Sequence, residues 1–298
     1  MSLTEEIRAL AAEKNAVILA HNYCRGEVQD ATDFTGDSLE LARRATQVEA
    51  ATIVFCGVRF MAETAKILNP DKRVLLPDES AGCPMADMIS GEELRALKAK
   101  HPGAKAVCYV NSTAEVKAEC DICVTSGNAE KVMKTFPAEQ EILFVPDQHL
   151  GGHVAGLLGR RYELWPGFCP IHAKLTAAAI AAARAAHPGV KVLVHPECAE
   201  AVRKAADFQL STGGMCKLVR ESKETEFIIG TETGILHRLE LENPGKRFYP
   251  VGDLVCADMK KITLEKVAAA LREMRPRVTV PETVARSARR AIEAMLAL

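Results

Sequence analysis

The segment AVILAHNY (residues 16–23) joins a short apolar run, typical of a buried strand, directly to polar residues. The same join recurs in AVCYVN (106–111) and VKVLVHPE (190–197). The polar triplets that follow these runs are His21-Asn22-Tyr23, Tyr109-Val110-Asn111 and His195-Pro196-Glu197. They begin 88 and 86 residues apart (109 − 21 and 195 − 109), and this interval predicts an internal repeat.

Two further sets of landmarks recur at nearly the same interval. Hydroxyl triplets open helix-like segments, and one closing cysteine ends each repeat. The hydroxyl triplets are Gly36-Asp37-Ser38, Thr125-Ser126-Gly127 and Ser211-Thr212-Gly213, and the closing cysteines are Cys83, Cys169 and Cys256. Strand-like and helix-like segments alternate throughout, which predicts parallel sheets covered on both faces.

We therefore expect an α/β protein made of three α/β/α sandwich units related by a pseudo-three-fold axis. The predicted units span residues 1–88, 89–174 and 175–261. Residues 262–298 exceed the repeat and contain two helix-like segments, the second of which Pro281 opens. We expect both helices to pack back on the first unit.

The composition excludes several classes of protein. The chain has 298 residues, of which 48% are hydrophobic and 26% charged, and its formal net charge is −1. No basic run is interleaved with aromatic residues, so nucleic-acid binding has no electrostatic support. The longest apolar stretch, residues 175–183, is too short for a membrane span. The first ten residues carry acids where a secretory signal needs basic residues, so we expect a cytoplasmic protein.

Cysteines in a cytoplasmic protein stay reduced, so those with motif-like placement favour metal binding or catalysis. Ligands of open α/β sheets bind beyond the carboxyl ends of the strands, and three such edges around one axis would bring the closing cysteines together. Structural zinc prefers four ligands. A [4Fe–4S] cluster also takes four cysteines, and three would leave one iron open as a Lewis acid. Spacing alone leaves zinc and three unrelated core cysteines as alternatives. The pair Cys120 and Cys123 is interpreted as core, because no second CxxC pair accompanies it.

The remaining landmarks suit a small anionic substrate. Hydroxyls and free N–H groups at helix starts bind phosphate and carboxylate well, which indicates Ser126 and Thr212. The alternative is that Ser126, Thr212 and Asp37 only cap helices. His195 with Glu197, and His21 with Tyr23, are candidates for proton transfer.

The chain closely resembles the quinolinate synthase family over essentially its whole length. The shared motifs are AHNY (20–23), GDSLELAR (36–43), FMAETAKILNP (60–70), CPMAD (83–87), YVNST (109–113), TSGNA (125–129), CPIH (169–172), VHPEC (194–198), STGGM (211–215), GTETGILHRL (230–239) and CADMKK (256–261). The resemblance implies a triangular fold with one central [4Fe–4S] cluster. It also implies condensation of iminoaspartate with dihydroxyacetone phosphate in NAD biosynthesis, giving quinolinate, phosphate and water, with an open iron as Lewis acid for dehydration.

The resemblance also implies roles for particular residues. The implied cluster ligands are Cys83, Cys169 and Cys256, and the implied catalytic residues are Tyr23, His21 and Glu197. The implied substrate-binding residues are His21, Ser38, Tyr109, Val110, Asn111, Ser126, His172, His195, Pro196, Glu197 and Thr212. Some family members carry a CxxCxxC motif near the C-terminus, of which only Cys256 is present here, so we expect no redox switch on the extra pair. Transient contact with the enzyme that produces iminoaspartate is also expected.

Two other functions fit the closing cysteines. Another cluster-dependent hydro-lyase would share the open iron but need not use a triose phosphate, and phosphate release separates the two. A non-enzymatic iron–sulfur sensor would have little use for Tyr23, Glu197 or the hydroxyl triplets.

Overall fold

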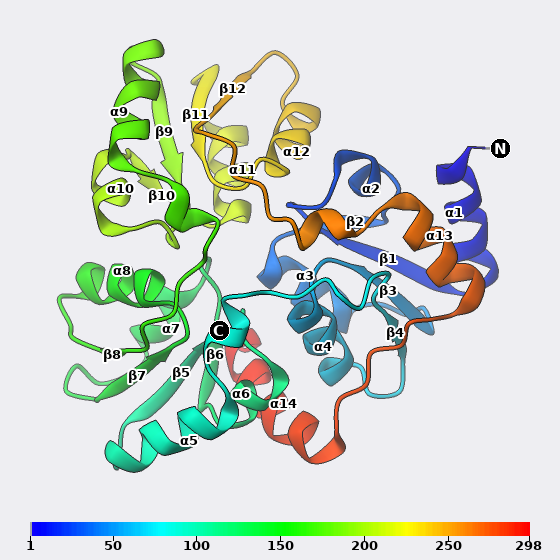
Figure 1. Ribbon diagram of the computed structural model, residues 1–298, viewed down its shortest axis with the longest axis horizontal. Coiled ribbons are helices and arrows are strands. Elements are labelled where there is room, and N and C mark those ends of the chain that lie inside the picture. Colours follow the sequence, from blue (N-terminus) through cyan, green and yellow to red (C-terminus); the bar gives the residue numbers. More distant parts are fainter. Residues whose placement is uncertain (1) are drawn as a thin grey trace.

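Three four-stranded parallel sheets, one per unit, form the protein, which is described here from a computed structural model covering residues 2–298 (Figure 1). Their strand orders are β2–β1–β3–β4, β6–β5–β7–β8 and β10–β9–β11–β12, which is one topology repeated three times. Figure 1 shows the units as three lobes around a common centre. The predicted α/β class with three similar units is therefore confirmed.

Helices alternate with the strands in the same order in every unit. The first unit contains α1 (Leu3–Glu13), β1 (Ala16–His21), α2 (Gly26–Asp30), β2 (Phe34–Gly36), α3 (Ser38–Thr46), β3 (Thr52–Cys56), α4 (Arg59–Leu68), β4 (Arg73–Leu75) and the 3₁₀ helix η1 (Ala86–Met88). The second contains α5 (Gly91–Lys100), β5 (Lys105–Tyr109), α6 (Ala114–Ala118), β6 (Ile122–Val124), α7 (Ala129–Met133), β7 (Ile142–Val145), α8 (Gln148–Leu158), β8 (Glu163–Leu164) and η2 (His172–Lys174).

The third unit completes the repeat and is followed by the two closing helices. It contains α9 (Ala177–Ala186), β9 (Lys191–Val194), α10 (Glu200–Ala205), β10 (Phe208–Gln209), α11 (Thr212–Glu221), β11 (Glu226–Gly230), α12 (Ile235–Glu242), β12 (Arg247–Pro250) and η3 (Met259–Lys261). The closing helices are α13 (Leu264–Glu273) and α14 (Glu282–Leu296).

Parallel register places the polar triplets beside the hydroxyl triplets. In the first sheet His21, the last residue of β1, is the register partner of Gly36, the last residue of β2. In the second sheet Tyr109 is opposite Val124. Because parallel strands end at the same edge of a sheet, each unit presents both triplets at its carboxyl edge.

Helix starts follow the predicted chemistry with one exception. Ser90 accepts from the Glu93 N–H and the Glu93 carboxylate accepts from the Ser90 N–H, so a capping box begins α5. The second hydroxyl triplet does not open its helix directly, because α7 begins only at Ala129. Asn128 Oδ1 accepts from both the N–H and the hydroxyl of Thr125, and these bonds fold the intervening residues into a loop.

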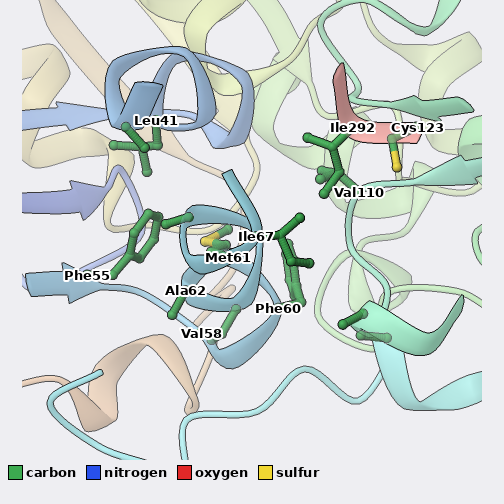
Figure 2. Packing of buried hydrophobic residues seen from close by; sticks show 14 of the residues in the cluster. Leu41, Phe55, Val58, Phe60, Met61, Ala62, Ile67, Val110, Cys123 and Ile292 are labelled. Carbon is green, nitrogen blue, oxygen red and sulfur yellow. The ribbon is translucent and has the colours of Figure 1, made fainter. Parts of the chain in front are cut away.

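The apolar core is continuous across the first two units but separate in the third. One cluster joins residues of β1, β3 and α4 to residues of β5, β6 and α14. In Figure 2, Ile292 of α14 lies beside Val110 of the second unit, and Phe60 of α4 lies between the two units. The third unit has two clusters of its own.

The predicted place of the last helix is wrong. Helix α13 packs against α1 and β3 of the first unit, as expected. Helix α14 instead lies mainly against α6 and β6 of the second unit, with a smaller contact on α4. Its buried stripe of Ala288, Ala291, Ile292 and Met295 covers the apolar surface that the short α6 leaves exposed.

No helix among residues 2–298 is both long enough and apolar enough to cross a membrane.

The shared core predicts a large cost for truncating Ile292. The Ile292→Ala variant should lose about 2–5 kcal/mol of unfolding free energy, because it opens a cavity between α14 and the second unit. Urea unfolding followed by circular dichroism measures this loss. The control is Leu241→Ala at an exposed position, which should change stability by less than about 0.5 kcal/mol. Equal stabilities of the two variants would contradict the placement of α14.

Candidate functional site

The carboxyl edges of the three sheets enclose a cavity of about 260 Å³. All but two of the predicted site residues line it. The residues that do so are His21, Tyr23, Ser38, Cys83, Tyr109, Asn111, Ser126, Cys169, His172, His195, Glu197, Thr212 and Cys256. Side chains far apart in sequence and from all three units therefore meet in one place.

Val110 and Pro196, predicted to bind substrate, do not line the cavity. Both are the middle residues of their polar triplets, and successive side chains of an extended chain point to opposite sides. Val110 is buried in the shared apolar core. Pro196 is also buried, and its carbonyl accepts a bond of 3.4 Å from Arg203.

The three closing cysteines occupy equivalent turns. A 3₁₀ helix begins three residues after each cysteine, at Ala86, His172 and Met259. The carbonyl of each cysteine accepts the N–H four residues later, and each thiol sulfur faces the N–H groups two and three residues later. Backbone N–H groups aimed at sulfur favour thiolate, so all three turns are suited to hold a cation-bound cysteine.

Polar contacts tie the Cys83 loop to the Cys256 loop. The Gly82 N–H donates to Asp258 Oδ1 at 3.3 Å, and Lys261 donates to the Ser80 carbonyl at 2.6 Å. Asp78 accepts from the Ser80 N–H and hydroxyl and pairs with Lys266 of α13 at 2.5 Å. These contacts hold two of the three cysteines at fixed positions on the cavity wall.

Burial governs the acidity of the thiols. It raises the pKa of Cys83 to about 12, and Glu197 and Cys256 nearby add to the effect. Burial likewise raises the pKa of Cys169, with Glu197 and Cys83 contributing. A bound cation reverses this balance, because it stabilises thiolate directly.

A chain of hydrogen bonds crosses the cavity wall from Tyr109 to Tyr23. The Tyr109 hydroxyl donates to Glu197 Oε1 at 2.6 Å, and Glu197 Oε2 lies 2.7 Å from His172 Nδ1. His172 Nε2 lies 2.8 Å from the Thr231 hydroxyl, which is 2.6 Å from the Tyr23 hydroxyl. The two acid–base candidates, Tyr23 and Glu197, are therefore connected through neighbouring side chains.

Glu197 carries the negative charge in this series of hydrogen-bonded side chains. Burial alone would raise the pKa of this carboxyl, but His195, His172 and the Tyr109 hydroxyl hold it below its usual range. Burial and the charge of Glu197 raise the pKa values of Tyr23 and Tyr109, so both phenols stay protonated. The site thus holds a carboxylate base between two phenolic acids.

Two histidines are held neutral in a defined tautomer. His21 Nδ1 accepts the Tyr23 N–H at 3.2 Å, and His195 Nδ1 accepts the Glu197 N–H at 3.3 Å. Burial lowers the pKa of His21 to about 3 and that of His195 to about 4. With Nδ1 occupied as an acceptor, Nε2 carries the hydrogen, so each ring is a neutral donor.

Some residues of the hydroxyl triplets cap helices, and some line the cavity. Asp37 caps α3 and Ser211 caps α11. Ser126 and Thr212 cap no helix, and with Ser38 they line the cavity. His195 Nε2 donates to the Ser126 oxygen at 3.2 Å, and the Ser126 hydroxyl also lies close to the Tyr109 hydroxyl. Asp37 therefore caps a helix but also lines the cavity, whereas Ser126 and Thr212 line the cavity without capping a helix.

One group of mixed ligands could hold a metal ion. The sulfur of Cys169, a ring nitrogen of His172 and a carboxylate oxygen of Glu197 all lie within 4.8 Å of one another. Thiolate, imidazole and carboxylate are the ligands that bind zinc and iron. From the sequence, His172 and Glu197 were expected to bind substrate, and neither was expected to bind a metal ion.

Two residues of the site were not identified from the sequence. Thr231 joins His172 to Tyr23, and the fully buried Glu232 accepts from the Cys256 N–H and pairs with Lys260 at 2.9 Å. Both lie in the GTETG segment directly after strand β11, so their strand-end position was the available signal. Cys123 of β6 is buried opposite Cys108 of β5, as expected of a core residue.

The fold and the cavity define an α/β protein with one thiol-lined site shared by three repeated units. A family model described as quinolinate synthetase A protein matches residues 5–297. The chain is 55% identical over 297 residues to the quinolinate synthase of Methanoregula boonei, covering 99% of this chain and 98% of that protein. It is 53% identical over 302 residues to a quinolinate synthase of Thermus thermophilus, covering 100% of this chain and 97% of that protein. The chain belongs to the quinolinate synthase family and is an enzyme.

The contacts that hold the Cys83 loop predict that Asp78 contributes to the free energy of unfolding in a pH-dependent way. Although desolvation opposes it, hydrogen bonds from Lys266 and Ser80 lower the pKa of Asp78 from 3.8 to about 2. A lowered folded-state pKa stabilises the protein above pH ~4 and this contribution disappears as the pH falls towards ~2. Asp78→Asn should therefore cost about 1 kcal/mol at pH 7, typical of a partly exposed ion pair, and progressively less below pH ~4.

Urea unfolding at a series of pH values measures this difference. The control is Glu282→Gln, which breaks the exposed pair of Glu282 with Arg286 and should have little effect at any pH. A constant difference between Asp78→Asn and the parent protein from pH 7 to pH 3 would contradict the interpretation.

Proposed function

We propose that this enzyme condenses iminoaspartate with dihydroxyacetone phosphate to give quinolinate, inorganic phosphate and water, using a [4Fe–4S] cluster held by Cys83, Cys169 and Cys256. The observation that carries the proposal is the convergence of three equivalent cysteine turns on one cavity that also holds neutral anion-binding donors and acid–base groups. Family membership supports the same reaction.

The residues present fit such a cluster. Three thiols from three separate loops line the cavity, and each is supported by backbone N–H groups. Three soft thiolate ligands suit iron–sulfur chemistry better than a closed zinc site, which takes four ligands close in sequence. When bound through three cysteines, the cluster supplies one open iron as a Lewis acid for loss of hydroxide.

The anionic end of the triose substrate fits the neutral donors. Ser38, Ser126 and Thr212 offer hydroxyls, and His21 offers a neutral Nε2–H. Donors fixed in a buried site bind phosphate without rearranging, and they continue to stabilise the charge as phosphate departs.

Proton transfer falls to Tyr23 and Glu197. Glu197 is ionised and can accept a proton, while Tyr23 is protonated and can donate one. Asn111 Oδ1 is buried, lines the cavity and has no hydrogen-bond partner within residues 2–298, so it is available to accept from an N–H of iminoaspartate.

We also propose a cytoplasmic location and a transient contact with the enzyme that supplies iminoaspartate. All ten cysteines are free thiols, which suits a reducing compartment. An unstable imine reaches this cavity more efficiently if it is released close by.

The cluster is tested by iron and sulfide analysis of anaerobically purified protein. Four irons per chain, with a broad visible absorption that bleaches in air, are expected. Stoichiometric zinc would overturn the assignment.

Replacing one ligand should separate folding from activity. Cys83→Ser should reduce activity at least a thousandfold and lower the iron content, while circular dichroism shows a folded protein. The control is Cys120→Ser, which changes a half-buried thiol away from the cavity and should keep iron and activity. A fully active, anaerobically reconstituted Cys83→Ser enzyme would refute this ligand set.

Phosphate release during turnover tests the substrate. The reaction should release one inorganic phosphate per quinolinate formed. A hydro-lyase that turns over a hydroxy acid without phosphate release would replace the proposed reaction.

A further inference from the structure

Asn22 fixes the direction of the hydrogen bond that Thr212 can offer to a ligand. Thr212 is the first residue of α11, is 3% exposed and lines the cavity. Asn22 Nδ2 donates to Thr212 Oγ1 at 2.9 Å, and within residues 2–298 this amide is the only side-chain partner of that hydroxyl. An amide NH₂ group donates and never accepts, so the hydroxyl oxygen is the acceptor and its single hydrogen is left for the cavity.

Arg238 determines which way the Asn22 amide faces. The oxygen and nitrogen of an asparagine side chain have nearly the same shape, so neighbours decide their positions. Arg238 Nη1 donates to Asn22 Oδ1 at 2.9 Å, and a guanidinium group has no acceptor. A flipped amide would set two donors against each other in a fully buried place. The NH₂ group must therefore face Thr212.

Arg238 is itself held in place from two sides. Its Nε donates to Glu242 Oε1 at 2.6 Å, and its Nη1 lies 3.5 Å from Glu40 Oε2. Glu40 belongs to the capping box of α3, the helix that begins with Ser38. The contacts thus connect α12 of the third unit with the first unit and with two of the cavity hydroxyls.

We infer that Asn22 and Arg238 are positioning residues that hold Thr212 as a hydrogen-bond donor toward the phosphate group of the substrate. This inference rests on the proposed function, because it takes the triose phosphate as the anion. Neither side chain lines the cavity. With the amide reversed, the Thr212 hydrogen would turn to Asn22, and oxygen lone pairs would face the anion.

The sharpest test is Asn22→Asp, which keeps the shape of the side chain but removes its donor. A carboxylate at this position still accepts from Arg238, so the contact between units survives. Thr212 must then donate to the carboxylate and present lone pairs to the ligand. A hydrogen bond to a charged group contributes enough that its loss weakens binding about tenfold to a hundredfold.

The effect of Asn22→Asp is measured in two ways on the cluster-loaded enzyme. Calorimetric titration with inorganic phosphate should show Kd raised about tenfold to a hundredfold. Steady-state kinetics should show KM for dihydroxyacetone phosphate raised by a similar factor, with KM for iminoaspartate unchanged and kcat changed much less. A purely structural role would leave phosphate affinity unchanged in a folded Asn22→Asp protein.

A double-mutant cycle separates donor direction from the added negative charge. Thr212→Val alone removes the hydroxyl and should weaken phosphate binding. Adding Asn22→Asp to Thr212→Val should then change Kd less than about twofold. If Asn22→Asp has its full effect without the hydroxyl, charge repulsion explains it and the inference is wrong.

Variants of Arg238 give an independent check. Arg238→Met frees the amide to flip and should weaken phosphate binding, while Arg238→Lys keeps a donor and should restore much of the affinity. The matched control is Arg286→Met, which breaks an exposed pair with Glu282 and should leave affinity unchanged.

The outcomes distinguish this inference from the proposed function. If the parent enzyme binds phosphate and Asn22→Asp binds it equally well, the inference fails and the function stands. If the parent enzyme neither binds phosphate nor uses a triose phosphate, both fail together.

Discussion

The buried carboxylate of Glu197 is the constraint that decides how the second and third units meet. A carboxylate removed from water is costly unless donors surround it. Those donors come from Tyr109 of the second unit and from His172, which follows the second cysteine. The third unit therefore reaches its most stable position only where these groups converge. The same convergence gathers the cysteines and hydroxyls around the cavity.

Apolar contacts join the first two units, whereas polar contacts largely join the third unit to the first. The first two units are joined by one apolar core, which makes them a single packed body. The third unit meets the first largely through polar pairs such as Tyr23 with Thr231 and Asn22 with Thr212. Polar pairs fix direction as well as distance, so the interface that carries the chemistry is also the one with the most defined geometry.

Much of this arrangement could be predicted from the sequence. Apolar runs such as AVILA, repeated at a constant interval, indicated the sheets, and their polar ends indicated the cavity edge. Val110 and Pro196 were misplaced because the triplets were treated as whole groups, although adjacent side chains face opposite ways. The contacts of Thr231 with His172 and Tyr23, and the partner of α14, could not be predicted, because they depend on the arrangement of the units, which no local pattern records.

Helix α14 has a consequence for the order in which the protein can form. It supplies buried side chains to the core shared by the first two units, yet in sequence it follows the whole third unit. A ribosome that has completed the first two units has not yet delivered the helix that closes them. Their shared core must therefore stay open until the third unit and α14 have been synthesised, so the first two units cannot complete their packing as they emerge.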